Sequence, residues 1–329
     1  MSNIMVSCRV RLARNYEDLP FRGRMTAEQS EQCVQRTLDA LRAQPQPYSF
    51  YSLKGMEENE KKALVEAHLI SPDLMEHCEA GAVLIRGDEK VSVMMNEEDH
   101  LRIQGISAGE SLAESAENAF AIDDALQSRL SFAFDAQWGY LTACPTNTGT
   151  GLRASVMLHL PMLTILKQMG KVNQLAAKLG LTIRGIYGEG SEAQGHLYQL
   201  SNQVTLGRTE KEIMDAVSAT ARQIAEMESV FRQKAMEKDM TAFEDSLFRS
   251  WGILCNARRM PIKEFMAHWS NLRMGAALKM LPVSLEKCDW LLTEAQPAHV
   301  RRSAGAVLND KETDARRSVI IREAINGGT

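Results

Sequence analysis

The sequence predicts an α+β domain followed by an all-helical region. Up to Gly207, short apolar runs typical of strands are mixed with helical patterns; beyond it, apolar residues recur at helical spacing only. The charge also changes sign: residues 1–231 carry 22 Lys and Arg against 30 Asp and Glu, whereas residues 232–329 carry 16 against 12. Because 329 residues suit two domains, we expect the α+β domain at 1–231 and the helical domain at 232–329.

The strongest strand pattern in the first part is a hairpin. Gly81–Gly87 and Val91–Met95 are apolar runs separated by a short polar turn, as in two antiparallel strands. Further strands are expected at Tyr140–Ala143, Leu181–Ile186 and His196–Leu200, and helices at Thr26–Arg42, Ser111–Leu130 and Arg153–Met169.

A long helix is expected to open the second pattern. Thr209 with Glu212 three residues later is a capping box, and apolar residues then recur every three or four positions as far as Phe231. This apolar stripe can face the core or form a dimer interface. Thr241 with Glu244 repeats the capping signal, and more helices are expected at 265–280, 285–293 and 314–325, separated by prolines.

Composition excludes several classes of protein. A net charge of −4 gives no general reason to bind nucleic acid or an anionic membrane, and no run of ~18 apolar residues is present to span one. The N-terminus lacks the apolar segment of a signal peptide. The six cysteines show neither metal-ligand spacing nor a disulfide framework, so we expect no protein metal site and reduced thiols in a cytoplasm.

Five segments carry the residues most able to do chemistry. Arg9 and Arg11 alternate, so on a strand both point to one face. The other segments are the acidic stretch Asn96–Arg102, the Gly/Thr-rich turn Cys144–Arg153 expected before a helix, the glycine-rich stretch Arg184–Glu192, and the lone His68. Each has a structural alternative when taken alone: a solvated basic strand, an acidic turn, a buried small cysteine, a hairpin turn or a structural histidine.

Together the segments favour phosphoryl transfer. Arg9, Arg11, Arg102, Arg153 and Arg184 all lie beside predicted strands or loops. Phosphoryl transfer depends mainly on positioning and charge stabilisation, and arginine binds phosphate oxygens with two parallel hydrogen bonds. Nearby glutamates could hold a planar cationic acceptor by the same paired geometry.

The motifs SCRVRLARN, NEEDHLR, CPTNTGTGLRASVM and RGIYGEGSE resemble those of the phosphagen kinases, most closely the bacterial protein arginine kinases. HLISP, QLSNQVTLG and RRSVIIREAI extend the resemblance over nearly the whole chain. It implies a catalytic domain with a large antiparallel sheet flanked by helices and a helical C-terminal dimerisation domain. It also implies transfer of phosphate from ATP, with Mg²⁺ on its phosphates, to arginine side chains of proteins.

The resemblance assigns roles position by position. Glu98 would grip the guanidinium and act as base, with either Glu189 or Glu192 as its partner, and Cys144 would be the reactive cysteine. The nucleotide would be bound by Ser7, Cys8, Arg9, Val10, Arg11, His68, Arg102, Arg153, Ala154, Ser155, Val156, Met157, Arg184, Gly185, Ile186, Tyr187, Gly188 and Glu189.

The resemblance further implies partners and regulation: a Clp protease that degrades the marked proteins, a CtsR-like heat-shock repressor as substrate, and an McsA-like activator. A phosphoarginine-sensing motif of the bacterial branch aligns with Thr313–Ser318; Asp314 and Arg317 are kept, while its first Arg and last Ala are replaced. The further N-terminal domain of small-guanidino kinases has no counterpart here, which favours a protein substrate. The alternatives are a kinase of a free guanidino metabolite and a non-catalytic adaptor of the Clp system.

Overall fold

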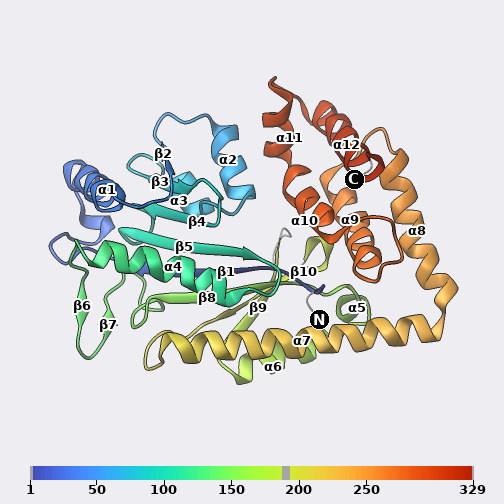
Figure 1. Cartoon of the computed structure of the whole chain (residues 1–329), viewed down its shortest axis with the longest axis horizontal. Coiled ribbons are helices and arrows are strands. Elements are labelled where there is room, and N and C mark those ends of the chain that lie inside the picture. Colours follow the sequence, from blue (N-terminus) through green and yellow to red (C-terminus); the bar gives the residue numbers. More distant parts are fainter. Residues whose placement is uncertain (1–2, 187–192, 328–329) are drawn as a thin grey trace.

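The computed structural model describes residues 3–186 and 193–327. Its centre is an eight-stranded sheet in which every neighbouring pair is antiparallel (Figure 1). In order across the sheet the strands are β2 (Tyr48–Ser52), β3 (Ala82–Arg86), β4 (Val91–Met95), β5 (Leu101–Ala108), β1 (Met5–Arg14), β8 (Leu152–His159), β10 (Leu197–Asn202) and β9 (Leu181–Gly185). A small hairpin, β6 (Phe134–Asp135) with β7 (Gly139–Tyr140), stands apart from it.

Helices surround the sheet and form the C-terminal part. Those of the first part are α1 (Ala27–Leu41), α2 (Glu58–Glu66), α3 (Pro72–Glu76), α4 (Leu112–Gln127), α5 (Pro161–Ile165) and α6 (Met169–Lys178), with short 3₁₀ turns η1 (Arg22–Arg24) and η2 (Gln194–His196). The later helices are α7 (Glu210–Lys238), α8 (Met240–Asn256), α9 (Ile262–Ala277), α10 (Leu285–Glu294), α11 (Pro297–Ala304) and α12 (Asp310–Asn326). Among the described residues, none of these helices is long and apolar enough to cross a membrane.

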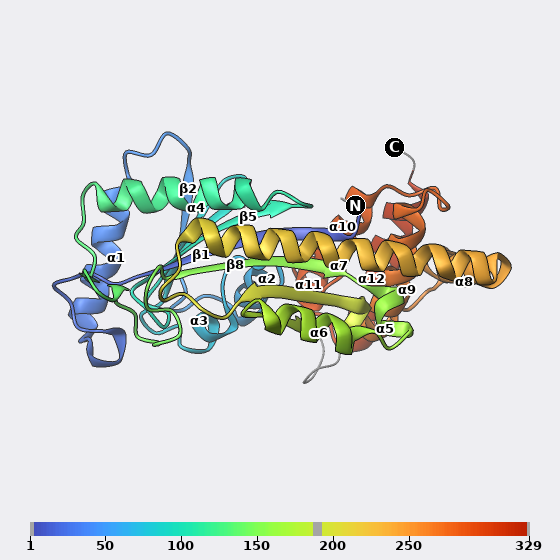
Figure 2. The same ribbon diagram turned by 90° about the horizontal axis from the view of Figure 1, so that it is seen from below.

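The two faces of the sheet differ in what covers them. One face packs against α1, α4, α6 and α7 in a single apolar core that includes Val10 of β1 and Val156 of β8. α4 and α7 run along this core in Figure 2. On the other face, a smaller core joins α2 and α3 to β3 and β4. On this second face, the central strands carry polar side chains.

The C-terminal helices pack onto one end of the sheet (Figure 1). Their core, centred on the fully buried Trp269 of α9, also contains Met157 and Leu197 from the sheet. The contact is close at η2, where a Cβ on Gly195 would come within 2.9 Å of the Met266 side chain. The helical part therefore touches the sheet directly as well as through α7.

Several expected elements are confirmed. The α+β sheet and the helical C-terminal region are both present. The capping box of α7 forms, with the Thr209 hydroxyl accepting from the Glu212 amide and the Glu212 carboxylate accepting from the Thr209 amide. Ile213, Val217 and Ala221 on the apolar stripe are buried in the core, so the core-facing interpretation of the stripe is confirmed.

Three expectations were wrong. Residues 152–159 form β8 rather than the start of a helix. Leu152, Ala154, Val156 and Leu158 alternate into the core as in a strand, but the run 156–158 is apolar without a break, so its period did not distinguish a strand from a helix. The strand expected over Tyr140–Ala143 shortens to Gly139–Tyr140. α8 begins at Met240 with Asp239 as its N-cap, two residues before Thr241, the N-cap of the predicted Thr241–Glu244 capping box.

Candidate functional site

The alternation of side chains along β1 places two arginines on the face of the sheet opposite the core formed with α1, α4, α6 and α7, here called the open face. Arg9 and Arg11 point to this face, whereas Cys8 and Val10 are buried in the core on the other. The same alternation buries Ala154 and Val156 of β8 in that core. These four side chains therefore point away from the arginine-lined face, so the nucleotide contacts predicted for these residues would have to come from their backbone.

Neighbouring strands bring further arginines beside this pair. Arg153 of β8 lies directly across from Arg11, and Arg102 of β5 pairs with Ala13 two residues further along β1. Burial and then the positive charges of Arg9, Arg102 and Arg153 lower the pKa of Arg11 well below its usual range. The pKa of Arg153 is lowered by burial and by Arg184 and Arg102. Such mutual repulsion indicates a site built for a polyanion.

One buried carboxylate balances part of this charge. Glu97, which is 1% exposed, accepts hydrogen bonds from Arg102 Nη1 and, at 2.5 Å, from the Ser71 hydroxyl. Its second oxygen accepts from the Glu98 amide at 3.1 Å. Glu97 thus links the arginine cluster to the β4–β5 turn. Its role was not assigned from the sequence, although three adjacent carboxylates imply a need for a cationic partner.

Glu98 lies at the edge of the arginine cluster with a partly exposed side chain. Its Oε2 is 3.7 Å from Arg102 Nη2. Burial raises its pKa, as do the charges of Asp99 and Glu97, while Arg102 and a hydrogen bond from Cys144 act in the opposite direction. A carboxylate that is accessible and more basic than usual is suited to accept a proton.

The Cys144 turn is held against Glu98 by its neighbour. Asp99 Oδ1 accepts hydrogen bonds from the Ala143 amide and from Asn15 Nδ2, each at 2.7 Å. The Cys144 thiol lies 3.0 Å from the Thr146 hydroxyl. The turn leads into strand β8. The prediction that a helix N-terminus binds an anion there is therefore wrong.

Arg14 supports the same turn from below. It is 1% exposed, forms two hydrogen bonds with Asp123, donates to the Thr150 carbonyl and lies with its guanidinium carbon 3.5 Å from the centre of the Tyr140 ring. From the sequence, Arg9 and Arg11 of the same strand were assigned to the site, and Arg14 was given no role. The even–odd alternation of the strand separates this structural arginine from Arg9 and Arg11.

A small pocket lies at the Arg9 end of the site. It is lined by Ser7, Arg9, His68, Ile106, Ser155, Met157, Ile186 and Gln199. His68 enters it from the turn after α2, where its φ of 60° is left-handed. Burial and the charges of Arg9 and Arg11 lower the pKa of His68 to about 3, so it is neutral near pH 7. Ile106 was missed because it lies outside the quoted motifs, and Gln199, the first residue of QLSNQVTLG, was missed because no role was assigned to that motif.

The remaining predicted residues lie at the edge of the site, outside the described residues or in the helical region. Arg184 and Gly185 end β9 beside the site, and Tyr187, Gly188, Glu189 and Glu192 lie outside the described residues. Arg317 is buried in the helical region, donating to the Ala295 and Met260 carbonyls at 2.6 Å and to Asp314 at 2.5 Å. Asp314 and Arg317 thus join α12 to its neighbours in the helical core.

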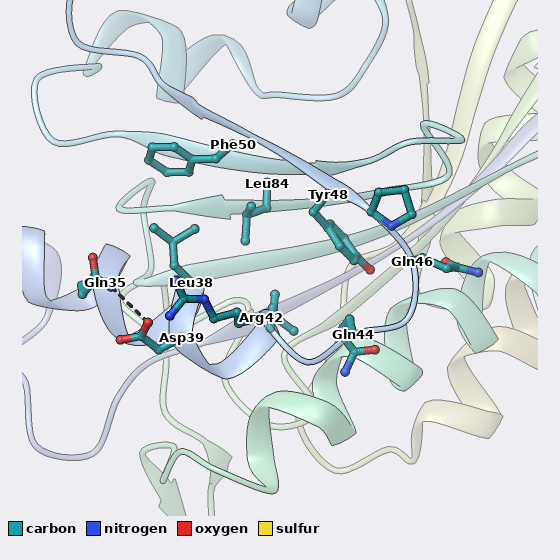
Figure 3. A pocket seen from close by; sticks show the side chains of 11 residues that line it. Gln35, Leu38, Asp39, Arg42, Gln44, Gln46, Tyr48, Phe50 and Leu84 are labelled. Atoms are coloured by element: carbon teal, nitrogen blue, oxygen red, sulfur yellow. Dashed lines mark hydrogen bonds between the residues drawn. The ribbon is translucent and has the colours of Figure 1, made fainter.

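A second hollow of about 390 Å³ lies at the far edge of the sheet, between α1 and β2 (Figure 3). Leu38, Tyr48, Phe50 and Leu84 provide much of its lining, with a hydrogen-bonded Gln35–Asp39 pair at its rim. It holds no cluster of like charges and none of the predicted site residues. The arginine-lined face is therefore the better candidate for catalysis.

Two parts of the chain match known protein families. Residues 29–231 match the model of the ATP:guanido phosphotransferase C-terminal catalytic domain, and residues 240–328 match that of the protein-arginine kinase McsB C-terminal domain. The chain belongs to the ATP:guanido phosphotransferase family.

Within this family, the chain is similar over nearly its whole length to proteins named protein-arginine kinase. It is 43% identical over 328 residues to a protein-arginine kinase of Caldanaerobacter subterraneus, covering 98% of this chain and 97% of that one. It is 44% identical to the protein-arginine kinase of Brevibacillus brevis, covering 98% and 92%. A duplicated taurocyamine kinase of Schistosoma mansoni aligns with a TM-score of 0.62 at 30% identity, over 69% of this chain and 33% of that one. Lombricine kinase shares the fold, with a TM-score of 0.62 at 23% identity over 71% and 68% of the two chains.

Proposed function

We propose that this chain is a protein arginine kinase, which transfers the γ-phosphate of ATP to arginine side chains in proteins. The observation that carries the proposal is the joint placement of Arg9, Arg11, Arg102 and Arg153 on one sheet face, with Glu98 at their edge. The names of the relatives support a protein as the acceptor.

The arginines would bind the phosphates of ATP and stabilise the charge of the transferring phosphoryl group. The depressed pKa values of Arg11 and Arg153 mean that bound phosphates would relieve repulsion already present in the protein. His68, neutral and donating or accepting within the small pocket, would contact the nucleotide beside Ser7 and Arg9.

The acceptor guanidinium is a poor nucleophile because its very high pKa keeps it protonated at neutral pH. Glu98 would bind it, align one terminal nitrogen with the γ-phosphorus and take the proton from that nitrogen as the bond forms. The N–P bond forms while the bond from the γ-phosphorus to the bridging oxygen breaks, and ADP leaves with that oxygen. Glu189 or Glu192 would be the second carboxylate on the guanidinium.

Mg²⁺ would enter with the nucleotide and neutralise phosphate charge. Among the residues that the structure describes, no group of three His, Cys, Asp or Glu side chains could hold a metal ion. We propose that the ion is bound mainly by phosphate and water, with the protein contributing the surrounding arginines.

The family resemblance supports a wider role for this activity. We propose that the product marks proteins for a Clp protease, that a CtsR-like repressor is among the substrates, and that an McsA-like activator and a homodimer take part in regulation. All six cysteines are free, as suits the cytoplasm that we propose as its location.

The test is incubation with ATP, Mg²⁺ and an arginine-rich protein, followed by mass spectrometry under conditions that preserve acid-labile phosphoarginine. Free arginine is offered in a parallel reaction. We expect phosphoarginine in the protein and little turnover of the free amino acid. Turnover of free arginine alone would favour a metabolite kinase, and no transfer to either acceptor would favour the adaptor.

A further inference from the structure

A carboxylate of the sheet domain binds the start of a helix in the C-terminal region. Glu66, the last residue of α2, accepts hydrogen bonds from the Ala298 amide at 2.9 Å and the His299 amide at 3.0 Å. The His299 ring nitrogen Nδ1 lies 2.9 Å from the same carboxylate and would donate to it. Glu66 thus satisfies orphan amides in the first turn of α11, where the helix dipole also favours a negative charge.

The contact is enclosed and has a second anchor. The Glu66 side chain is 17% exposed and that of His299 is 3% exposed. Asn59, at the other end of α2, donates to the Ala298 carbonyl at 3.1 Å. α2 and α11 lie side by side in Figure 1, so α2 is fixed along its length to the helical region.

The same turn of α2 delivers His68 to the small pocket. The His68 amide donates to the Val65 carbonyl at 2.9 Å, and the His68 carbonyl accepts from Gln104 Nε2 at 2.7 Å. Only Ala67 separates His68 from Glu66. A shift of the last turn of α2 would therefore move the imidazole relative to Ser7 and Arg9, which line the same pocket.

The far side of the contact is anchored within the helical region. Arg317 of α12 donates to the carbonyl of Ala295, the residue that ends α10 just before α11 begins. Arg301 of α11 also contacts Asp310 and Thr313, at 2.8 and 3.3 Å. The start of α11 is therefore held between α12 on one side and α2 on the other.

We propose that Glu66 is a positioning residue for nucleotide binding. By binding the first turn of α11 it holds the last turn of α2, and with it His68, in the place required for ATP. The affinity for ATP then depends on the docking of a helix from the C-terminal region, although that helix contributes no residue to the pocket. This inference rests on the nucleotide role proposed above for His68.

The first test is the change of Glu66 to Gln, with the dissociation constant for ATP measured by calorimetry. A glutamine amide group would point a donor at the donors of α11, so the contact opens without loss of side-chain volume. We expect ATP binding to weaken about three- to tenfold, with kcat at saturating ATP within about twofold of the parent. Glu60, exposed on the same helix, gives the matched control Glu60→Gln, which should leave both values unchanged.

A second pair of variants approaches the contact from α11. His299→Phe keeps a ring in the buried position and removes the Nδ1 donor, so it should weaken ATP binding in the same direction. His299→Asn places an amide donor near the position of Nδ1 and should restore affinity to within about twofold of the parent. If both variants bind ATP as the parent does, the contact does not control nucleotide affinity.

A double-mutant cycle with His68→Ala separates the possible results. If Glu66 acts through His68, Glu66→Gln should have no further effect on ATP affinity once His68 is absent. An equal effect in both backgrounds would overturn the inference. If His68→Ala binds ATP normally, the nucleotide role of His68 fails; if it binds weakly while Glu66→Gln binds normally, only the positioning role fails.

Discussion

Changing Glu97 to Gln would remove the buried carboxylate that balances part of the charge of the arginine cluster. Glu97 is 1% exposed and its partner Arg102 18% exposed. Breaking a buried pair costs about 3–5 kcal/mol, and the partial exposure of Arg102 reduces this to roughly 2–3 kcal/mol through solvent screening. At about 2–4 °C per kcal/mol, the thermal midpoint should fall by roughly 5–10 °C.

The assay is thermal unfolding followed by circular dichroism, with and without saturating ATP. The phosphates would supply negative charge where the variant lacks it, so ATP should raise the midpoint of the variant more than that of the parent. Glu110→Gln, which breaks the exposed pair with Arg222, is the control and should cost under about 1 kcal/mol. An unchanged midpoint for Glu97→Gln, or an equal effect of ATP on both proteins, would refute the charge balance inferred here.

Three further predictions follow from the site. Glu98→Gln should lower kcat by about 10²–10⁴-fold while leaving the ATP dissociation constant within about twofold, and a loss of ATP binding would contradict its place beside the acceptor. Burial depresses the pKa of His68 to about 3, whereas in the unfolded chain it is near 6.5. Between these two values the unfolded state binds a proton that the folded state does not, so the free energy of unfolding falls as pH falls from 6.5 toward 3. Acid titration of stability should therefore show His68→Asn losing less than the parent, by about 1.4 kcal/mol per pH unit below 6.5; parallel curves would count against this. Gly149→Ala would place a Cβ 2.5 Å from the Thr205 carbonyl oxygen at a φ of 114°, so kinetics should show at least about tenfold lower kcat/KM through displacement of the Cys144 turn, whereas parental kinetics would show that the turn tolerates the shift.

The sequence indicated which residues gather on one sheet face better than it indicated the local backbone that carries them. The alternation of Arg9 and Arg11 was sufficient to place both on one face of a strand. The family motifs marked continuous stretches, however, and a strand sends every second residue to the opposite face. Cys8 and Val10 were therefore included with the arginines although they lie in the core.

The supporting residues of the site depend on pairings that no local pattern contains. Asp99 bonds Asn15 and Ala143 across 84 and 44 positions of sequence, and Glu66 reaches α11 across more than 230. Strand β8 was mistaken for a helix because the run 156–158 is apolar without a break, which hides the alternation of Leu152, Ala154, Val156 and Leu158 into the core. Met157 is buried on the second face only because the C-terminal helices pack there, so the periodicity of this one segment could not reveal it.

The most direct test is single-turnover transfer of ³²P-labelled γ-phosphate from ATP to a basic protein, compared with the same protein carrying lysine at every arginine. We predict label in the arginine protein only, released by mild acid and reduced at least about a hundredfold in Glu98→Gln. Equal labelling of the lysine protein, or undiminished transfer by Glu98→Gln, would contradict arginine phosphorylation at this site.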